Sequence, residues 1–345
     1  MRSRVISTCL AAVALVIVAA PAQAAPEQLQ PLRPAPLTNV FTSPARDVVL
    51  RSPLNATAAE TAHTATARLF TAPGGVSIPV EVSSAYKASN SVIQSYVNYL
   101  GGLMHGDELG KLHVFIASPK QIQSTFCGAG ALACYEGDNQ TMYVPGANQQ
   151  SNPPLQFLIA HEYGHHIEMN RSNAPWVAFD TGVKNWFTYE QVCTRMRDRR
   201  LGTNYWNDPS EGFAESYADS QYAGVAFPFS SLMLPNQGAY NAIRQDVLQP
   251  WTGPRVVPFT GNLAARRGAT QNFQIPTPLD GTASFTLSPP SKADYRLQVL
   301  AGGQTIAKGA RGTTTIKTLC GVRSLTLQVT RASGSGAFSL IANVP

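Results

Sequence analysis

The sequence has few of the residues and patterns that mark several common protein classes. Its 345 residues include six histidines and five cysteines, and no two cysteines form a C-x-x-C pair, which argues against a cysteine zinc site. The one dense basic run, 195–200, has no interleaved aromatic residue and is typical of a solvated helix face. Beyond residue 20 no apolar run approaches the ~20 residues that a membrane-spanning helix needs. We therefore expect neither a nucleic-acid partner nor a membrane anchor.

The apolar run at the N-terminus predicts export. Arg2 and Arg4 precede the apolar stretch 5–20, and residues 22–24 (A-Q-A) have the small-x-small pattern of a signal-peptide cleavage site. We predict a signal peptide over residues 1–24, cleaved after its last alanine, and a secreted, extracellular protein. Loss of the two arginines lowers the basic count from 26 to 24 against 20 acidic residues, so the net charge falls from +6 to +4.

Export also decides how the cysteines are interpreted. Cys9 leaves with the signal peptide, and the other four form an even set in an oxidising compartment, which predicts two disulfides. Four cysteines allow three pairings. The segment from Cys127 to Cys134 is short and glycine-rich, so closing it costs little entropy, and we favour that pair. Cys193 with Cys320 then follows by elimination.

Composition divides the mature chain into three regions. Residues 25–65 are rich in Pro, Ala and Thr and cannot bury enough apolar surface to fold alone, so they are interpreted as a linker, a disordered lead or a propeptide. Residues 66–250 mix strand-like and helix-like patterns, which predicts an α+β domain. Residues 255–345 carry short alternating runs about ten residues apart, which predicts a small all-β sandwich.

Individual elements can be placed within these regions. Strands are predicted over 76–82 and 111–117, with a helix over 86–103 between them. A further short strand, 140–144, precedes the most informative helix, and we expect it to be an exposed edge strand that pairs with an extended substrate. In the last region the predicted strands cover six runs: 272–275, 283–287, 295–299, 313–317, 324–329 and 337–341.

The pattern H-E-x-x-H occurs at His161, Glu162 and His165 in an apolar stretch. If this stretch is helical, with Asn152 as the cap and Pro153 at the first position, the two histidines lie one turn apart on one face. They can then bind one zinc ion, and Glu162 lies beside the metal, where it can take a proton from a bound water. The alternative is that both are ordinary hydrogen-bonded core histidines.

A third ligand is available on a second predicted helix, whose start is marked by Asp208 and Pro209. Glu211 and Glu215 lie one turn apart on one face of it. We predict Glu211 as the third zinc ligand, with a fourth position left for water, and Glu215 as the acceptor of the far N–H of a ligand histidine. The alternative is a capping box in which Glu211 only closes the helix end and Glu215 is the ligand.

The motif H-E-Y-G-H, followed about 45 residues later by E-G-F-A-E, resembles the gluzincins, which are zinc peptidases with a glutamate third ligand. Over about residues 110–225 the chain more closely resembles the neutral zinc metallopeptidases of bacteria, although that pattern has Asp where this chain has Glu215. The resemblance implies a zincin-like catalytic domain built around the H-E-x-x-H helix. Residues 255–345 resemble the pre-peptidase C-terminal domain of secreted bacterial peptidases, which implies an accessory module.

Together these patterns predict a secreted zinc metalloendopeptidase, a hydrolase that cleaves protein or peptide substrates with a zinc-bound water activated by Glu162. Tyr217 and Tyr222 are candidates for stabilising the oxyanion. The alternative is a non-catalytic exported binding protein with a structural or degenerate zinc site, in which the β-domain carries the function.

Overall fold

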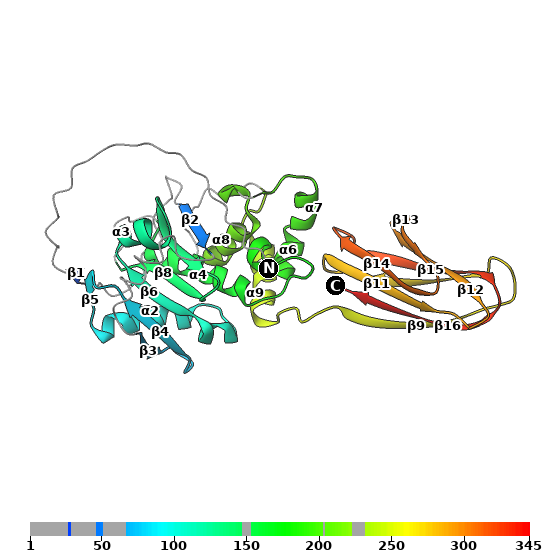
Figure 1. Ribbon diagram of the computed structural model, residues 1–345, viewed down its shortest axis with the longest axis horizontal. Coiled ribbons are helices and arrows are strands. Elements are labelled where there is room, and N and C mark those ends of the chain that lie inside the picture. The colour runs from blue at the N-terminus through cyan, green and yellow to red at the C-terminus, as the bar shows by residue number, and fades with distance from the viewer. Residues whose placement is uncertain (1–26, 29–45, 51–66, 147–152, 203, 223–231) are drawn as a thin grey trace.

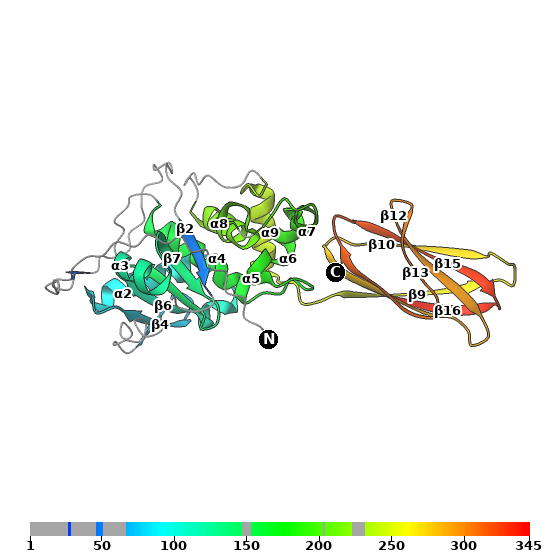
Figure 2. The ribbon, with the colours of Figure 1, turned by 45° about the horizontal axis from the view of Figure 1, so that its top comes forward.

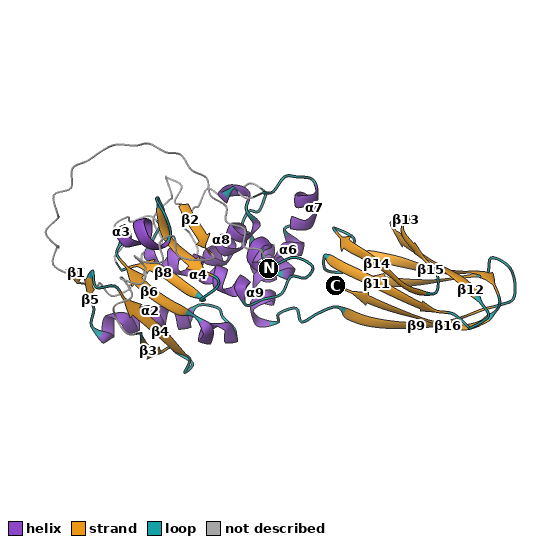
Figure 3. Cartoon of the chain, in the orientation of Figure 1, coloured by secondary structure: helices purple, strands orange, loops and turns teal. Residues whose placement is uncertain are grey.

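The computed structural model describes residues 27–28, 46–50, 67–146, 153–202, 204–222 and 232–345. The predicted signal peptide, residues 1–24, and most of the segment 25–65 lie outside these ranges. Within them the chain forms two parts, a first that mixes helices with strands and a second that contains strands alone (Figures 1 and 3). No helix within the described ranges is long and apolar enough to cross a membrane.

A six-stranded sheet lies in the first part, in the order β2-β7-β8-β6-β4-β3. Its strands are β2 (Arg46–Leu50), β3 (Arg68–Thr71), β4 (Ser77–Val82), β6 (His113–Ala117), β7 (Ala131–Glu136) and β8 (Thr141–Pro145). The central strands β4, β6 and β8 are parallel, whereas β7 runs antiparallel to β8, and β2 pairs with β7 in parallel. A separate parallel pair joins β1 (Glu27–Gln28) to β5 (Tyr86–Lys87).

The expectation that residues 140–144 form an exposed edge strand is wrong. This segment is β8, which is buried along its whole length and lies between β6 and β7. The hairpin partner β7 adds on the outer side of β8, because a short turn lets the chain fold directly back on itself. The edge that faces away from β3 therefore belongs to β7 and to the strand that pairs with it, β2.

The longer helices are α2 (Asn90–Gly102), α4 (Leu155–Met169), α8 (Pro209–Gln221) and α9 (Gln237–Leu248). The short ones are α3 (Pro119–Gln121), α5 (Ala178–Thr181), α6 (Lys184–Tyr189), α7 (Val192–Arg197) and the helical turns η1 (Asp107–Lys111), η2 (Ile122–Phe126) and η3 (Tyr205–Asn207).

The H-E-x-x-H stretch is helical, as predicted, but α4 starts later than expected. Its N-cap is Pro154, with φ −60° and ψ 146° and no side-chain cap. Pro153 precedes this second proline, whose ring disfavours the helical conformation for the residue before it, so the helix cannot begin at Pro153. The predicted cap Asn152 lies outside the described residues.

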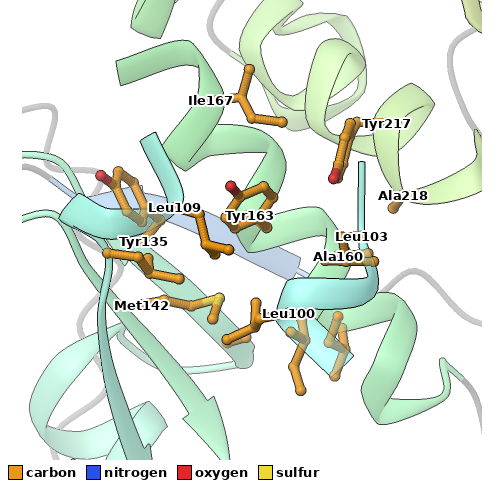
Figure 4. Packing of buried hydrophobic residues seen from close by; sticks show 14 of the residues in the cluster. Leu100, Leu103, Leu109, Tyr135, Met142, Ala160, Tyr163, Ile167, Tyr217 and Ala218 are labelled. Carbon is orange, nitrogen blue, oxygen red and sulfur yellow. The ribbon is translucent and has the colours of Figure 1, made fainter. Parts of the chain in front are cut away.

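α4 is buried on every side from Leu155 to Glu168. Ala160, Tyr163 and Ile167 belong to the main apolar cluster, and Figure 4 shows Tyr163 between Leu109 and Tyr217. At 100° per residue these three positions lie on a different face of the helix from His161 and His165. One face of α4 therefore packs in the core while another carries the candidate ligands.

α4 and α8 pack against each other, and a glycine permits their close approach. A Cβ added at Gly164 would lie 2.7 Å from the Cα of Ala214, which is closer than real Cβ atoms come. Because Gly164 lies between the histidines of the motif and Ala214 lies between Glu211 and Glu215, this contact brings the two acidic residues up to the two histidines.

The second part is β-sandwich-like, with two four-stranded antiparallel sheets in the orders β10-β15-β12-β13 and β14-β11-β16-β9 (Figure 2). Its strands are β9 (Arg255–Leu263), β10 (Thr270–Pro276), β11 (Gly281–Ser288), β12 (Asp294–Ala301), β13 (Gln304–Gly309), β14 (Gly312–Leu319), β15 (Ser324–Ser333) and β16 (Gly336–Val344). Each of the six predicted runs falls in a strand, and β9 and β13 are additional. Alternate apolar side chains, such as Phe285, Leu297 and Leu327, fill the space between the sheets.

Both predicted disulfides are present. Cys127 bonds to Cys134, and Cys193 in α7 bonds to Cys320, which follows β14. The second bond joins the two parts of the molecule across 127 residues of sequence.

Candidate metal centre

Three side chains predicted as ligands converge at one point between α4 and α8. Nε2 of His161 and Nε2 of His165 lie 3.2 Å apart. Oε2 of Glu211 is 3.3 Å from the first nitrogen and 3.6 Å from the second. All three residues are buried, and their ligand atoms lie within 4.8 Å of one another, so the group can hold a metal ion.

Each histidine is oriented by a carboxylate at its far nitrogen. Nδ1 of His161 lies 3.2 Å from Oε2 of Glu215, and Nδ1 of His165 lies 2.8 Å from Oε2 of Glu168. Ser210 holds the second carboxylate by donating its hydroxyl to Glu168 Oε2 at 2.8 Å. When each Nδ1 donates its proton to a carboxylate, both Nε2 lone pairs point at Glu211, and such partners fix the tautomer of metal-binding histidines.

The arrangement brings electron-rich atoms together. Oε2 of Glu211 is buried and accepts no hydrogen bond within the described residues. It faces the two Nε2 lone pairs of His161 and His165 without a donor between them. Three such donors at these distances favour a cation between them.

The donor set fits zinc. Two imidazole nitrogens and one carboxylate oxygen are ligands that zinc accepts, and three protein donors leave a fourth tetrahedral position open. The structure thus brings together His161, His165 and Glu211 as the sequence predicts, while the identity of the ion as zinc stays a prediction.

The two alternatives for α8, with Glu211 as the third ligand or with Glu211 as a helix cap and Glu215 as the ligand, predict different geometries. Asp208 caps α8 by accepting from the backbone N of Ser210 at 3.0 Å, as its position predicts. Glu211, one turn in, turns its side chain to the histidine Nε2 atoms and does not merely close the helix end. Glu215 lies on the opposite, Nδ1 side of His161.

Glu162, the predicted proton acceptor, lies on α4 next to His161 and is 0 % exposed. Its catalytic role stays a prediction. Tyr217 and Tyr222 are the two candidates for stabilising the oxyanion. The Tyr217 hydroxyl donates its hydrogen bond to Met104 O at 2.6 Å, so in this structure it does not donate to the metal site. Tyr222 is half-buried at the C-cap of α8, and its role stays a prediction.

Sequence reasoning missed Glu168 and Ser210. The signal for Glu168 was present, because a residue three positions after His165 shares its helix face. Ser210 could not be found in this way, since its role depends on how α8 packs against α4. The neighbouring His166 does not join the site, because its Nε2 contacts Glu108 O at 2.8 Å and its Nδ1 contacts the Tyr135 hydroxyl at 2.9 Å.

No family model matches this chain. No curated protein matches it either. Among solved structures, it is similar in part to the Yersinia pseudotuberculosis-derived mitogen, with 18% identity, 27% of this chain and 87% of that chain covered and a TM-score of 0.22. The Aeromonas hydrophila periplasmic inhibitor of g-type lysozyme gives 14% identity, 28% and 93% coverage and a TM-score of 0.23.

A third partial similarity is to the CBM36-1 domain of a multidomain xylanase from the hindgut metagenome of Trinervitermes trinervoides, with 18% identity, 26% and 95% coverage and a TM-score of 0.19. With TM-scores this low, the matches carry no argument about fold or function.

Proposed function

We propose that this protein is a secreted zinc-dependent endopeptidase with a zincin-like catalytic domain. The observation that carries the proposal is the convergence of His161 Nε2, His165 Nε2 and Glu211 Oε2 in a buried site, with Glu162 next in the chain to the first ligand. A purely structural zinc site usually has four protein ligands, whereas three protein donors leave a position for water. Three donors beside a buried carboxylate therefore favour a hydrolase.

The roles of the side chains follow from their positions. Bound zinc supplies a Lewis acid and lowers the pKa of a coordinated water towards about 7. Glu215 and Glu168 hold the two imidazoles in a fixed tautomer, so both Nε2 atoms stay available as ligands. Glu162 accepts the proton of the attacking water on its carboxylate and donates it to the leaving amine.

The proposal is tested with purified full-length protein and casein. Hydrolysis should stop when a chelator removes the metal and return when zinc is added. Glu162→Gln should lower kcat by about 10²–10⁴-fold because it removes the proton acceptor, while leaving the zinc content unchanged.

Glu190→Gln is the matched control. Burial raises the pKa of Glu190 to about 7, so glutamine closely replaces its protonated form. Its carboxylate lies 3.3 Å from Nη1 of Arg195, away from the metal centre. This variant should retain full activity. Stoichiometric zinc without any hydrolysis by the wild-type protein would instead favour the non-catalytic binding protein.

We further propose that the β-sandwich-like part is an accessory module held in a fixed orientation. The Cys193–Cys320 disulfide joins this part to α7. A hydrogen bond of 3.0 Å from the backbone N of Asp280 to Thr188 Oγ1 joins it to α6.

A further inference from the structure

The sandwich carries the excess of basic residues in this chain. Residues 255–345 contain ten basic residues, two acidic residues and no histidine, so their net charge is +8. Residues 25–254 contain 14 basic and 18 acidic residues, so their net charge is −4. One of the two acidic residues of the sandwich, Asp280, is buried and paired with Arg323. The exposed surface of the sandwich is therefore strongly basic, although the charge of the whole chain is moderate.

Most of these charges lie at one end of the sandwich, which we call the distal end. It consists of the turns 264–269, 289–293 and 334–335 with the strand ends beside them. In Figure 1 this end lies farthest from the first part, and the disulfide that joins the two parts lies at the other end of the strands. One acidic residue, Asp294, lies at the distal end. The basic residues there are Arg266, Arg267, Lys292, Arg296, Arg311 and Arg331.

Backbone contacts hold the turn 264–269 against β15. Arg331 of β15 donates its backbone N–H to Ala269 O at 2.9 Å. In the next strand of this sheet, β12, Arg296 is paired with Thr330. The arginines of this turn and of the two strands are therefore neighbours in space although they are distant in sequence.

The other two turns pack on each other. A Cβ added at Gly334 would lie 2.6 Å from the Cα of Ala293 and 2.9 Å from Lys292 O, so the two backbones are in close contact. Arg311 donates from Nη2 to Pro290 O at 2.6 Å, which holds its guanidinium against the same turn. Because the turn 334–335 continues directly from β15, the six basic side chains belong to one surface.

The distal end lacks the groups that nucleic acids and membranes use. No aromatic side chain of residues 255–345 is exposed, so the bases of a nucleic acid have no surface to stack on. The exposed large apolar residues of the sandwich, Val256, Ile306 and Ile341, lie outside the three turns, so no such side chain is available there to enter a membrane. What the distal end offers is charge, mainly from arginines, whose planar guanidinium pairs with oxyanions through two hydrogen bonds.

We propose that the distal end of the sandwich binds a linear anionic polysaccharide, whose repeated carboxylate or sulfate groups pair with these basic side chains. Attraction between opposite charges drives the association, so salt weakens it. The inference does not depend on the proposed endopeptidase function, because it concerns a surface at the opposite end of the sandwich from the first part.

The test measures the Kd of the full-length protein for fluorescently labelled oligosaccharides by anisotropy. Heparin presents sulfate and carboxylate groups, polygalacturonate presents carboxylate alone, and dextran is uncharged. The distal variant combines Arg266→Gln, Arg267→Gln and Lys292→Gln, which are exposed and make no side-chain hydrogen bond or ion pair within the described residues. Arg296→Gln in β12 is a second variant of the same surface, and it should weaken binding about threefold.

The matched control combines Arg200→Gln, Arg244→Gln and Lys317→Gln. It removes the same two arginines and one lysine from exposed positions outside the distal end, and one of them belongs to the dense basic run 195–200. Denaturant unfolding checks that each variant is folded.

The wild-type protein should bind at least one of the two anionic polymers and not dextran, with a Kd that rises with salt. The distal variant should bind at least tenfold more weakly, and the control should stay within about threefold of the wild-type protein. Binding of both polymers identifies carboxylate as the recognised group, and binding of heparin alone identifies sulfate.

Absence of binding to both polymers would overturn the inference, as would an equal loss in the distal variant and the control. Tighter binding to duplex DNA, or to vesicles of phosphatidylcholine and phosphatidylserine, would also overturn it, because the partner would then be a nucleic acid or a membrane. Since every readout is binding, a protein that cleaves no casein contradicts the proposed function and leaves this inference standing.

Discussion

The two parts of the molecule differ in how many ionisable side chains they bury. The first part, which mixes helices with strands, buries many of them, among them the glutamates and histidines of α4 and α8. In the sandwich, residues 255–345, the buried polar side chains are Thr277 and Asp280, and the core is otherwise apolar. Burying charge is costly unless it is compensated, so a region that does so repeatedly is where function is expected.

The one buried carboxylate of the sandwich lies at its junction with the first part. Asp280 accepts from Arg323 Nη1 at 2.7 Å and from the backbone N of Gly321 at 3.0 Å. Its own backbone N donates to Thr188 of α6. Asp280 therefore serves the attachment of the sandwich, whereas the three candidate metal ligands all lie in the first part.

The largest expected effect is on metal retention. Glu211→Ala should abolish stoichiometric zinc after dialysis and all hydrolysis, because it removes a ligand atom. Glu215→Gln and Glu168→Gln should keep the metal with roughly 10–100-fold weaker affinity, since they change only what the Nδ1 atoms contact. Metal analysis of the three variants decides the matter, and complete zinc loss in Glu215→Gln with retention in Glu211→Ala would exchange the two roles.

The next-largest effect is expected on stability, when the disulfide that joins the two parts is removed. Replacing Cys193 and Cys320 with serine should lower the free energy of unfolding by about 5 kcal/mol in the chain-entropy model, because the bond closes a long loop. The Cys127–Cys134 bond closes a far shorter loop, so replacing both cysteines with serine should cost about 2.5 kcal/mol. Denaturant unfolding measures both. Zinc content should stay unchanged in each variant, and its loss on removal of the 193–320 bond would show that the sandwich supports the metal centre.

A smaller effect is expected at the contact between α4 and α8. Gly164→Ala places a Cβ against Ala214, and overpacking of this kind costs about 1–3 kcal/mol. Because the contact also sets the distance from Glu211 to the histidines, zinc affinity should fall together with stability. Gly102→Ala is the control, since a Cβ there meets nothing within 4 Å. A Gly164→Ala protein with normal stability and zinc affinity would contradict the role given to this glycine.

The smallest effect is on pH dependence at the junction. Burial lowers the pKa of Lys184 to about 8, although Asp280 and Asp246 oppose the shift, and its Nζ lies 4.5 Å from the ring centre of Trp251. Between pH 8 and 10 the unfolded chain holds a proton that the folded protein has lost, so this residue makes stability rise with pH. Lys184→Met should remove a rise in the free energy of unfolding on the order of 1 kcal/mol between pH 8 and 10. Denaturant unfolding at several pH values measures this rise. If the free energy of unfolding changes equally with pH in the variant and the wild-type protein, the prediction is contradicted.

The parts of the structure that sequence predicted depend on local patterns. The helix around His161 and His165, the start of α8 at Pro209 and six strands of the sandwich each follow from residues close together in the chain. The disulfides also followed, because a short glycine-rich loop selected Cys127 with Cys134 and left one other pair.

What sequence did not predict depends on contacts between distant segments. β8 looked like an edge strand because its neighbour β7 could not be placed beside it from pattern alone. The hydrogen bond from Ser210 to Glu168 exists only because α8 packs on α4, and β2 lies in a segment whose composition indicated no element. The predicted start of α4 was wrong for a local reason, because the sequence itself shows that Pro154 disfavours the helical conformation at Pro153.

X-ray absorption at the zinc edge of the purified full-length protein tests the central claim most directly. The account predicts one zinc ion per chain, with two nitrogen ligands at about 2.0–2.1 Å, oxygen ligands at about 2.0–2.2 Å and no sulfur. His161→Ala should lose one nitrogen from this shell or lose the metal, and Glu190→Gln should leave the shell unchanged. Absence of zinc, or a sulfur ligand at about 2.3 Å, would contradict the assignment of the metal to His161, His165 and Glu211.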